Sequence, residues 1–281
     1  MIKYENCKLC GNNDFILLKK TAQYNFVKCS ICGIFCVNPV PEISDEFYQD
    51  YDFNRRFIKY FDKYKNLWLN SLNKKIKRVE KLINKTLEAD KMRFLDIGCG
   101  AGGYVFAARE LGFEAYGIDL DEKSCSFAKS LGLNIKNGDF IKSNFPEDFF
   151  DLIMAKQVLE HIPEPKEFLL EINRIMKQDG ILMLDVPNQD GLIPAIKIIF
   201  NLKQDEYGFV QPPRHLFAYG KGTLIKLLKE TGFKVMFCHS TMPGDATDYP
   251  LHRQSIFEKV IFKITAKINK GSVLVIYAQK K

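Results

Sequence analysis

The chain has 281 residues, of which 46% are apolar and 27% are charged, and its formal net charge is +7. These values exclude a disordered chain and a small disulfide scaffold, and the charge falls well short of that of a dedicated nucleic-acid binder. No run of about 18 apolar residues is present, so we expect no transmembrane helix. The first ten residues lack the apolar segment of a signal peptide. We therefore expect a cytoplasmic protein whose eight cysteines are reduced or metal-bound.

Five of these cysteines fall within the first 36 residues. Cys7 and Cys10, and likewise Cys29 and Cys32, are separated by two residues, and eighteen residues lie between the two pairs. This spacing is typical of a zinc ribbon, in which four thiolates surround one ion. A site with four protein ligands is closed, so the zinc is expected to be structural, and a module this small is expected to need it for folding. Cys36 is predicted to pack in the core. The alternative that Cys36 binds the metal in place of Cys32 stays open.

Residues 54–90 carry apolar side chains at helical spacing, which predicts a long helix. Asn70, Ser71 and Asn73 suggest a break within it. Between residues 55 and 93, thirteen basic residues stand against four acidic ones, and they alternate with the apolar stripe. This pattern predicts a solvated basic face on a helical connector that covers the cofactor site.

From residue 93 onward, short apolar runs alternate with helical stretches, which predicts βα units and a parallel sheet with helices on both faces. The expected strands are at 93–97, 114–118, 149–155, 180–186, 233–238 and 272–278. The expected helices are at 102–112, 122–131, 164–177, 221–231 and 254–268. The predicted domains are a zinc-ribbon module over 1–45, the helical connector over 46–92, and a cofactor-binding domain over 93–281.

A glycine-rich loop follows the first strand of that domain. Gly98, Gly100 and Gly102 let the backbone turn and approach a ligand, and the next helix begins with free N–H groups. Asp119 ends the second strand, where a carboxylate can accept hydrogen bonds from both hydroxyls of a ribose. Asp96, just before the loop, would repel a pyrophosphate but suits a ligand that carries an ammonium and a sulfonium. These residues favour S-adenosylmethionine over a dinucleotide.

The segment Leu95–Gly102 resembles motif I of the class I S-adenosylmethionine-dependent methyltransferases. Residues 138–140, 150–162 and 182–188 resemble that family's adenine-binding element, fourth-strand motif and fifth strand, in the family's order. The resemblance implies an α/β, Rossmann-like fold with a seven-stranded sheet whose last strand is antiparallel. It also implies an acid for the adenine amine and an apolar side chain for the adenine ring. The expected cofactor contacts are Asp96, Gly98, Cys99, Gly100, Gly102, Asp119, Leu120, Asp139, Phe140, Ala155 and Gln157.

The cysteine module, with residues 38–41 and 47–51 after it, is similar to the N-terminal part of a bacterial methyltransferase group that carries a zinc-binding module. Some members of that group act on nucleotide-linked sugars. Their sugar C-methyltransferases have an additional C-terminal domain that this sequence lacks. The resemblance therefore implies a sugar-related acceptor without implying that particular reaction.

Two of the four histidines are candidate catalytic groups. His215 lies in the proline-fixed, aromatic loop 211–217 after the fifth strand, and we predict that it removes a proton from the acceptor. His161, just past the fourth strand, is the second candidate, although a structural hydrogen bond or helix cap is the more common role of a histidine at that position. Arg214, which could pair with a phosphate or carboxylate, and Glu160 are the candidate substrate contacts.

These observations predict methyl transfer from S-adenosylmethionine to the oxygen, nitrogen or carbon of a small molecule. The expected acceptor is a sugar or sugar nucleotide in polysaccharide or secondary-metabolite biosynthesis. One alternative is an RNA methyltransferase that grips phosphates with the zinc ribbon and the basic segment 55–93. The other is an inactive fold that serves as a binding module, which the intact acids and glycines of the loop argue against.

Overall fold

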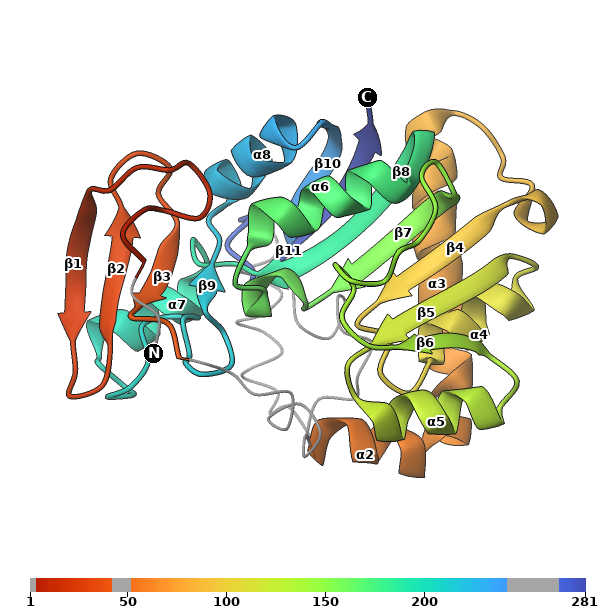
Figure 1. Cartoon of the computed structure of the whole chain (residues 1–281), viewed down its shortest axis with the longest axis horizontal. Helices are drawn as coiled ribbons and strands as arrows, with labels where there is room; N and C mark the ends of the chain where they lie inside the picture. Colours follow the sequence, from red (N-terminus) through yellow and green to blue (C-terminus); the bar gives the residue numbers. More distant parts are fainter. Residues whose placement is uncertain (1–3, 42–51, 242–267) are drawn as a thin grey trace.

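The computed structural model describes residues 4–41, 52–241 and 268–281. Its centre is a seven-stranded sheet (Figure 1) in the order β10-β11-β8-β7-β4-β5-β6. The strands β4 to β8 run parallel, whereas β11 is antiparallel to both β8 and β10, which confirms the predicted fold class. The bounds are β4 (Arg93–Ile97), β5 (Glu114–Asp119), β6 (Asn134–Asn137), β7 (Phe150–Lys156), β8 (Met176–Pro187), β10 (Phe233–Thr241) and β11 (Val273–Lys280).

Helices cover both faces of this sheet, because successive side chains of each buried strand point to opposite faces. On one face Phe94, Leu152 and Met154 pack against α3 and α4, and on the other Leu95 and Ile153 pack in the core that α6 and α8 complete. The helices are α2 (Asp52–Lys59), α3 (Phe61–Ile83), α4 (Gly103–Glu110), α5 (Glu122–Ser130), α6 (Pro165–Ile175), α7 (Leu192–Ile199) and α8 (Lys221–Glu230), with short turns η1 (Ala89–Lys91) and η2 (Leu159–His161). Among the described residues, no helix is both long and apolar enough to cross a membrane.

The six expected strands and the helices between them are present, and their ends shift by a few residues. Three short elements were not expected from the sequence. One is β6, whose four residues include one buried side chain, Ile135. The others are α7 and the short strand β9 (Phe217–Ala218). The helix expected over 254–268 lies almost entirely outside the described residues.

The predicted break at Asn70–Asn73 is wrong. α3 runs without interruption through these positions, and the helical segment is instead divided at Tyr60, between α2 and α3. Ser71 is buried, and its hydroxyl lies 3.2 Å from the Tyr104 hydroxyl on α4. The expectation of a solvated basic face is also wrong at Lys75, which is 8% exposed and lies 3.5 Å from the carboxylate of Asp185 on β8.

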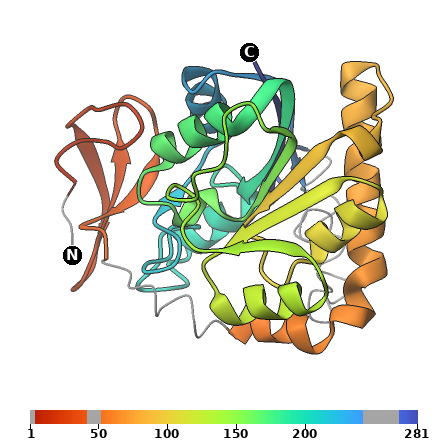
Figure 2. The same cartoon turned by 45° about the vertical axis from the view of Figure 1, so that its right-hand side comes forward.

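A second, smaller sheet is built from the N-terminal residues and one distant strand. β1 (Phe15–Lys20), β2 (Asn25–Cys29) and β3 (Phe35–Asn38) form an antiparallel meander, and β9 extends it by pairing Cys36 with Phe217. Figures 1 and 2 place this sheet beside α6, α8 and β9. Tyr4 stacks on Phe217 with ring centroids 6.3 Å apart, and its hydroxyl donates to the Pro163 carbonyl. The N-terminal residues therefore share one core with the larger sheet.

Candidate active site

The glycine-rich loop connects the carboxyl end of β4 to α4. The backbone N–H groups of Gly98 and Cys99 both donate to the Ile118 carbonyl of β5, which fixes the turn against the neighbouring strand. Gly98 has a φ of 71°, and a Cβ there would lie 2.5 Å from the Val158 side chain. Only glycine fits this position, because it tolerates positive φ and leaves the required space. The loop therefore has one defined shape at the sheet edge where open α/β folds bind ligands.

Asp119 stands at the end of β5, directly beside this loop. One carboxylate oxygen accepts a 2.7 Å hydrogen bond from the Gly100 N–H, and the other accepts a 2.8 Å bond from the Asp121 N–H. Burial raises the pKa of Asp119, and these two backbone donors oppose the shift. Each carboxylate oxygen can accept a second hydrogen bond. The pair of oxygens is thus held in place and can still receive a vicinal diol.

Asp96 lies one strand away, on the face of β4 that α3 and α4 cover. It is 4% exposed, and burial raises the pKa of its carboxyl to about 8. Lys156 on β7 opposes this shift, and the nearby Asp119 adds to it. A buried acid and a half-buried acid beside one loop suit a cation, because a positive ligand would stabilise both in the ionised form.

The pKa of Asp96 predicts how the stability of the ligand-free protein depends on pH. A carboxyl whose pKa rises on folding binds a proton more tightly in the folded state, so wild-type stability falls as the pH rises from about 4 to about 8. Asp96→Asn removes this titration. We expect its stability advantage over wild type to grow across that range in urea unfolding and to level off above about pH 8. A difference between the two proteins that does not change with pH would contradict this.

The remaining expected cofactor contacts differ in their surroundings. Asp139 is exposed, and its carboxylate accepts from the Ile141 N–H at 2.9 Å, whereas Phe140 is 6% exposed and packs edge-on against Phe168. Ala155 is fully buried within β7. Cys99 is buried in the loop and Leu120 is half-buried after β5.

Gln157 is the most informative of these contacts, because it has a strained backbone and an unused donor. Its φ is 54°, and its backbone N–H donates to the Asp185 carbonyl at 2.8 Å. Its side-chain amide nitrogen is buried and has no hydrogen-bond partner among the residues that the structure describes. Buried donors are nearly always paired in native proteins, so this one points to a ligand at the end of β7.

The two candidate histidines, which are 54 positions apart in the sequence, lie in contact. The rings of His161 in η2 and His215 in the loop before β9 are 4.9 Å apart between centroids, edge to face. Nδ1 of His161 lies 2.8 Å from the Arg214 carbonyl, and Nδ1 of His215 lies 3.2 Å from the Phe209 carbonyl. Burial lowers the pKa of His161 to about 4 and that of His215 to about 3. Both imidazoles are therefore neutral near pH 7.

Glu160 joins this pair from inside the protein. Its side chain is fully buried, and within residues 4–41, 52–241 and 268–281 neither carboxylate oxygen has a hydrogen-bond partner. Burial raises the pKa of Glu160 to about 8. Arg214 is exposed at the same loop and holds His161 through its carbonyl. The structure brings these four residues together from two separate segments, and the sequence gave no sign that Glu160 is buried.

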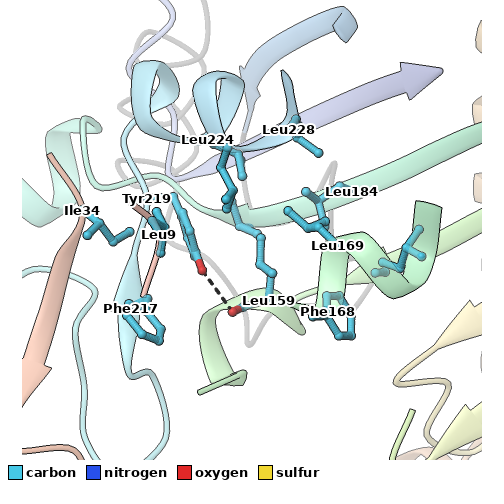
Figure 3. Close-up of a cluster of buried hydrophobic side chains, with 14 of the residues drawn as sticks. Leu9, Ile34, Leu159, Phe168, Leu169, Leu184, Phe217, Tyr219, Leu224 and Leu228 are labelled. Carbon is cyan, nitrogen blue, oxygen red and sulfur yellow. Dashed lines mark hydrogen bonds between the residues drawn. The ribbon is translucent and has the colours of Figure 1, made fainter. Parts of the chain in front are cut away.

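The N-terminal sheet holds the His215 loop against this site. The Leu216 N–H donates to the Glu160 carbonyl at 2.9 Å, and the Leu216 carbonyl accepts from the Val37 N–H of β3 at 3.2 Å. Figure 3 shows the Tyr219 hydroxyl directed at the Leu159 carbonyl, a 3.3 Å bond, with Ile34 of the N-terminal sheet nearby. The loop is therefore clamped between η2 and β3.

The four cysteines of the predicted zinc site also come together. The sulfur atoms of Cys7 and Cys32 are 3.5 Å apart, those of Cys10 and Cys29 are 3.6 Å apart, and all four lie within 4.8 Å of one another. Cys36 is buried on β3 and does not belong to this group. Four converging thiols with no other ligand suit a tetrahedral zinc ion.

A family model described as a methyltransferase domain matches residues 71–236, more than half of the chain. A sterol 24-C-methyltransferase of Gibberella zeae is 34% identical over 119 residues, which are 36% of this chain but only 30% of the relative. A ubiquinone biosynthesis O-methyltransferase of Rickettsia canadensis is 24% identical over 169 residues, 56% of this chain and 69% of the relative. A solved methyltransferase from Archaeoglobus fulgidus has the same fold, with a TM-score of 0.52, 22% identity, and coverage of 79% of this chain and 99% of that one.

Proposed function

Because the chain belongs to the methyltransferase domain family that matches its residues 71–236, we propose that it methylates a small molecule with S-adenosylmethionine. A lone pair of the acceptor attacks the methyl carbon, and the carbon–sulfur bond breaks with its electron pair on sulfur, which leaves S-adenosylhomocysteine. The observation that carries this proposal is the position of Asp119, whose two oxygens are fixed beside the glycine loop and can each accept a further hydrogen bond.

The cofactor is proposed to lie across the carboxyl ends of β4, β5 and β7. Asp119 would accept from both ribose hydroxyls, and Asp96 would stabilise the positive charges of the ammonium and the sulfonium. Asp139 and Phe140 would hold the adenine, by a hydrogen bond to its amine and an apolar contact with its ring. The unpaired amide of Gln157 would donate to the cofactor or to the acceptor beside it.

Asp119→Ala is expected to weaken S-adenosylmethionine binding by about 30- to 700-fold. The change removes two hydrogen bonds to a charged acceptor, each worth roughly 1–2 kcal/mol. Calorimetric titration measures the loss, and circular dichroism checks that the variant folds. The exposed Asp90→Ala is the matched control and should bind as wild type does. An unchanged affinity of Asp119→Ala would contradict the placement of the ribose.

For the acceptor we propose a sugar or sugar nucleotide. The resemblance of the cysteine module to that of sugar-acting methyltransferases supports this class. The exposed Arg214 beside the histidine pair could bind an anionic group such as a diphosphate. The relatives named above act on a sterol and on a ubiquinone precursor by their names, so small apolar acceptors are the nearest competitors.

The acceptor class is tested by incubating the protein with S-adenosylmethionine carrying a labelled methyl group and with separate pools of nucleotide sugars, prenylated quinones, sterols and RNA. We expect label in the nucleotide-sugar fraction together with S-adenosylhomocysteine. Label in RNA would favour the basic segment 55–93 as a phosphate-binding surface and would overturn the small-molecule proposal. Failure to bind S-adenosylmethionine at all would favour an inactive binding module.

We also propose that the pair His161 and His215 activates the acceptor and that zinc on the four cysteines is structural. The contact between the two rings, beyond the carboxyl end of β7, supports the activating role of the histidines. The convergence of the four thiols supports the structural role of the zinc. Reduced thiols are stable in the cytoplasm, which is the proposed location of the protein.

A further inference from the structure

Glu160 presents a buried carboxyl group for which the described part of the chain supplies no hydrogen-bond partner. Its side chain is fully buried, and both carboxylate oxygens lack a hydrogen-bond partner. Burying a carboxyl without any partner is unfavourable in both protonation states, and far more so when it is ionised. Since its backbone carbonyl is anchored by the Leu216 N–H, the residue is held in this position. A carboxyl held at a fixed buried position with unused oxygens is a group that an added cation would stabilise in its ionised form.

The two imidazoles beside Glu160 are arranged as ligands of such a cation. A carbonyl can only accept a hydrogen bond, so each Nδ1 that faces a carbonyl carries the proton of the neutral ring. The other nitrogen of the His215 ring, Nε2, then holds a lone pair, whereas the His161 ring also hydrogen-bonds the Gln157 backbone. Metal-binding histidines are commonly fixed in this way, through a hydrogen bond from the second ring nitrogen to a carbonyl or carboxylate.

We propose that Glu160, His161 and His215 bind one divalent first-row transition-metal ion, a site separate from the four cysteines. One ligand atom from each of the three residues lies within 4.8 Å of the other two. Around an ion at bonding distance the ligand atoms stand roughly 3.4 Å apart, so the cluster closes by small side-chain rotations when the ion enters. Two imidazole nitrogens and one carboxylate oxygen suit Zn²⁺, Mn²⁺ or Fe²⁺, and they leave coordination positions open.

The catalytic role of this ion rests on the proposed function, because the ion would explain how the histidine pair acts on the acceptor. An acceptor hydroxyl bound at an open position of the ion loses its proton to solvent more readily. The resulting oxygen attacks the methyl carbon with its electron pair, and the carbon–sulfur bond breaks toward sulfur. The two histidines are then ligands, and the ion lowers the pKa of the acceptor.

The test measures metal binding directly. The purified full chain is treated with EDTA under mild conditions, and its metal content is checked, with one zinc per chain expected to remain on the thiolates. Mn²⁺ and, separately, Co²⁺ are then titrated by calorimetry. We expect one further ion per chain. The visible spectrum of bound Co²⁺ should lack the strong thiolate charge-transfer bands that replacement of the cysteine-bound zinc would give.

Glu160→Gln and His215→Asn are each expected to weaken this second ion at least about 100-fold while the first zinc stays in place. His239→Asn is the matched control, because His239 is exposed on β10 and lies outside the cluster. Circular dichroism and zinc content check that each variant folds. Because the two substitutions lie on different elements, the test stays valid if one variant fails to fold. The absence of a second ion, or its retention at full affinity in both variants, would overturn the proposal.

The proposed function and this inference can fail separately. Binding of Mn²⁺ in a protein that transfers no methyl group to any acceptor pool would support the ion and contradict the function. Methyl transfer at the full rate after the second ion has been removed would overturn its assigned role and leave the function intact. Loss of methyl transfer on EDTA treatment, restored by Mn²⁺, supports both.

Discussion

Replacing Cys29 with serine is expected to unfold the N-terminal sheet and to release the zinc. Zinc bound to four protein ligands contributes about 10–16 kcal/mol of apparent free energy in zinc-finger peptides, and the substitution removes one of the four ligands. Since β3 pairs with β9 and bonds the Leu216 carbonyl, we also expect the His215 loop to lose its support. Hydrogen exchange should show lost protection in β1, β2, β3 and the loop before β9, and methyl transfer should fall sharply.

Cys36→Ser is the matched control for this experiment. Cys36 lies on the same sheet and is equally buried, but it is outside the group of four thiols. The Cys36→Ser variant should keep one zinc per chain, and its stability should fall only by the lost packing energy. A metal-free protein whose N-terminal sheet stays protected would contradict the structural role of zinc. Loss of zinc in Cys36→Ser together with its retention in Cys32→Ser would show that these two cysteines exchange roles.

His215→Asn is expected to lower the rate of methyl transfer by about 10²- to 10⁴-fold with unchanged affinity for S-adenosylmethionine. The substitution removes a side chain that is proposed to act on the acceptor and to make no contact with the cofactor. Single-turnover kinetics measures the rate, and calorimetry measures the cofactor affinity. His239→Asn again serves as the control.

The contact between the two rings extends this expectation to His161. The sequence favoured a structural role for His161, with loss of stability exceeding loss of turnover on substitution. Because the rings are 4.9 Å apart, we expect His161→Asn to lower turnover as well. If neither variant loses more than a few-fold in rate, positioning of the reactants carries the reaction, and the acceptor is an amine that needs no proton removed.

The positions of the loop and the acid in the proposed cofactor site could be predicted because the signals for them are local. Gly98 follows one short apolar strand, and Asp119 is the last residue of the next. The alternation of strands and helices in the sequence therefore predicts both positions. The cysteine pairs are equally local, since Cys7–Cys10 and Cys29–Cys32 each span only four residues. Such features need no knowledge of distant contacts, and the structure places each of them where the pattern indicated.

Other features of the structure depend on contacts between distant segments, which the sequence alone does not reveal. β9 is a strand of two residues that exists only because Phe217 meets Cys36, 181 positions earlier in the chain. Lys75 looked like one of many surface lysines, yet its partner Asp185 lies 110 residues away. The polar Ser71 suggested a break in a helix because its hydrogen-bonding partner, Tyr104, belongs to another helix. In each case tertiary contacts override the local pattern.

A calorimetric titration of the purified chain with S-adenosylmethionine tests the proposed cofactor site most directly. We expect one binding site per chain, similar binding of S-adenosylhomocysteine, and no binding of NAD, because Asp96 beside the loop disfavours a pyrophosphate. Asp119→Ala should lower the affinity for both sulfur compounds by a similar factor. Absence of binding by wild type, or tight binding of NAD in its place, would contradict the assignment of this site to S-adenosylmethionine.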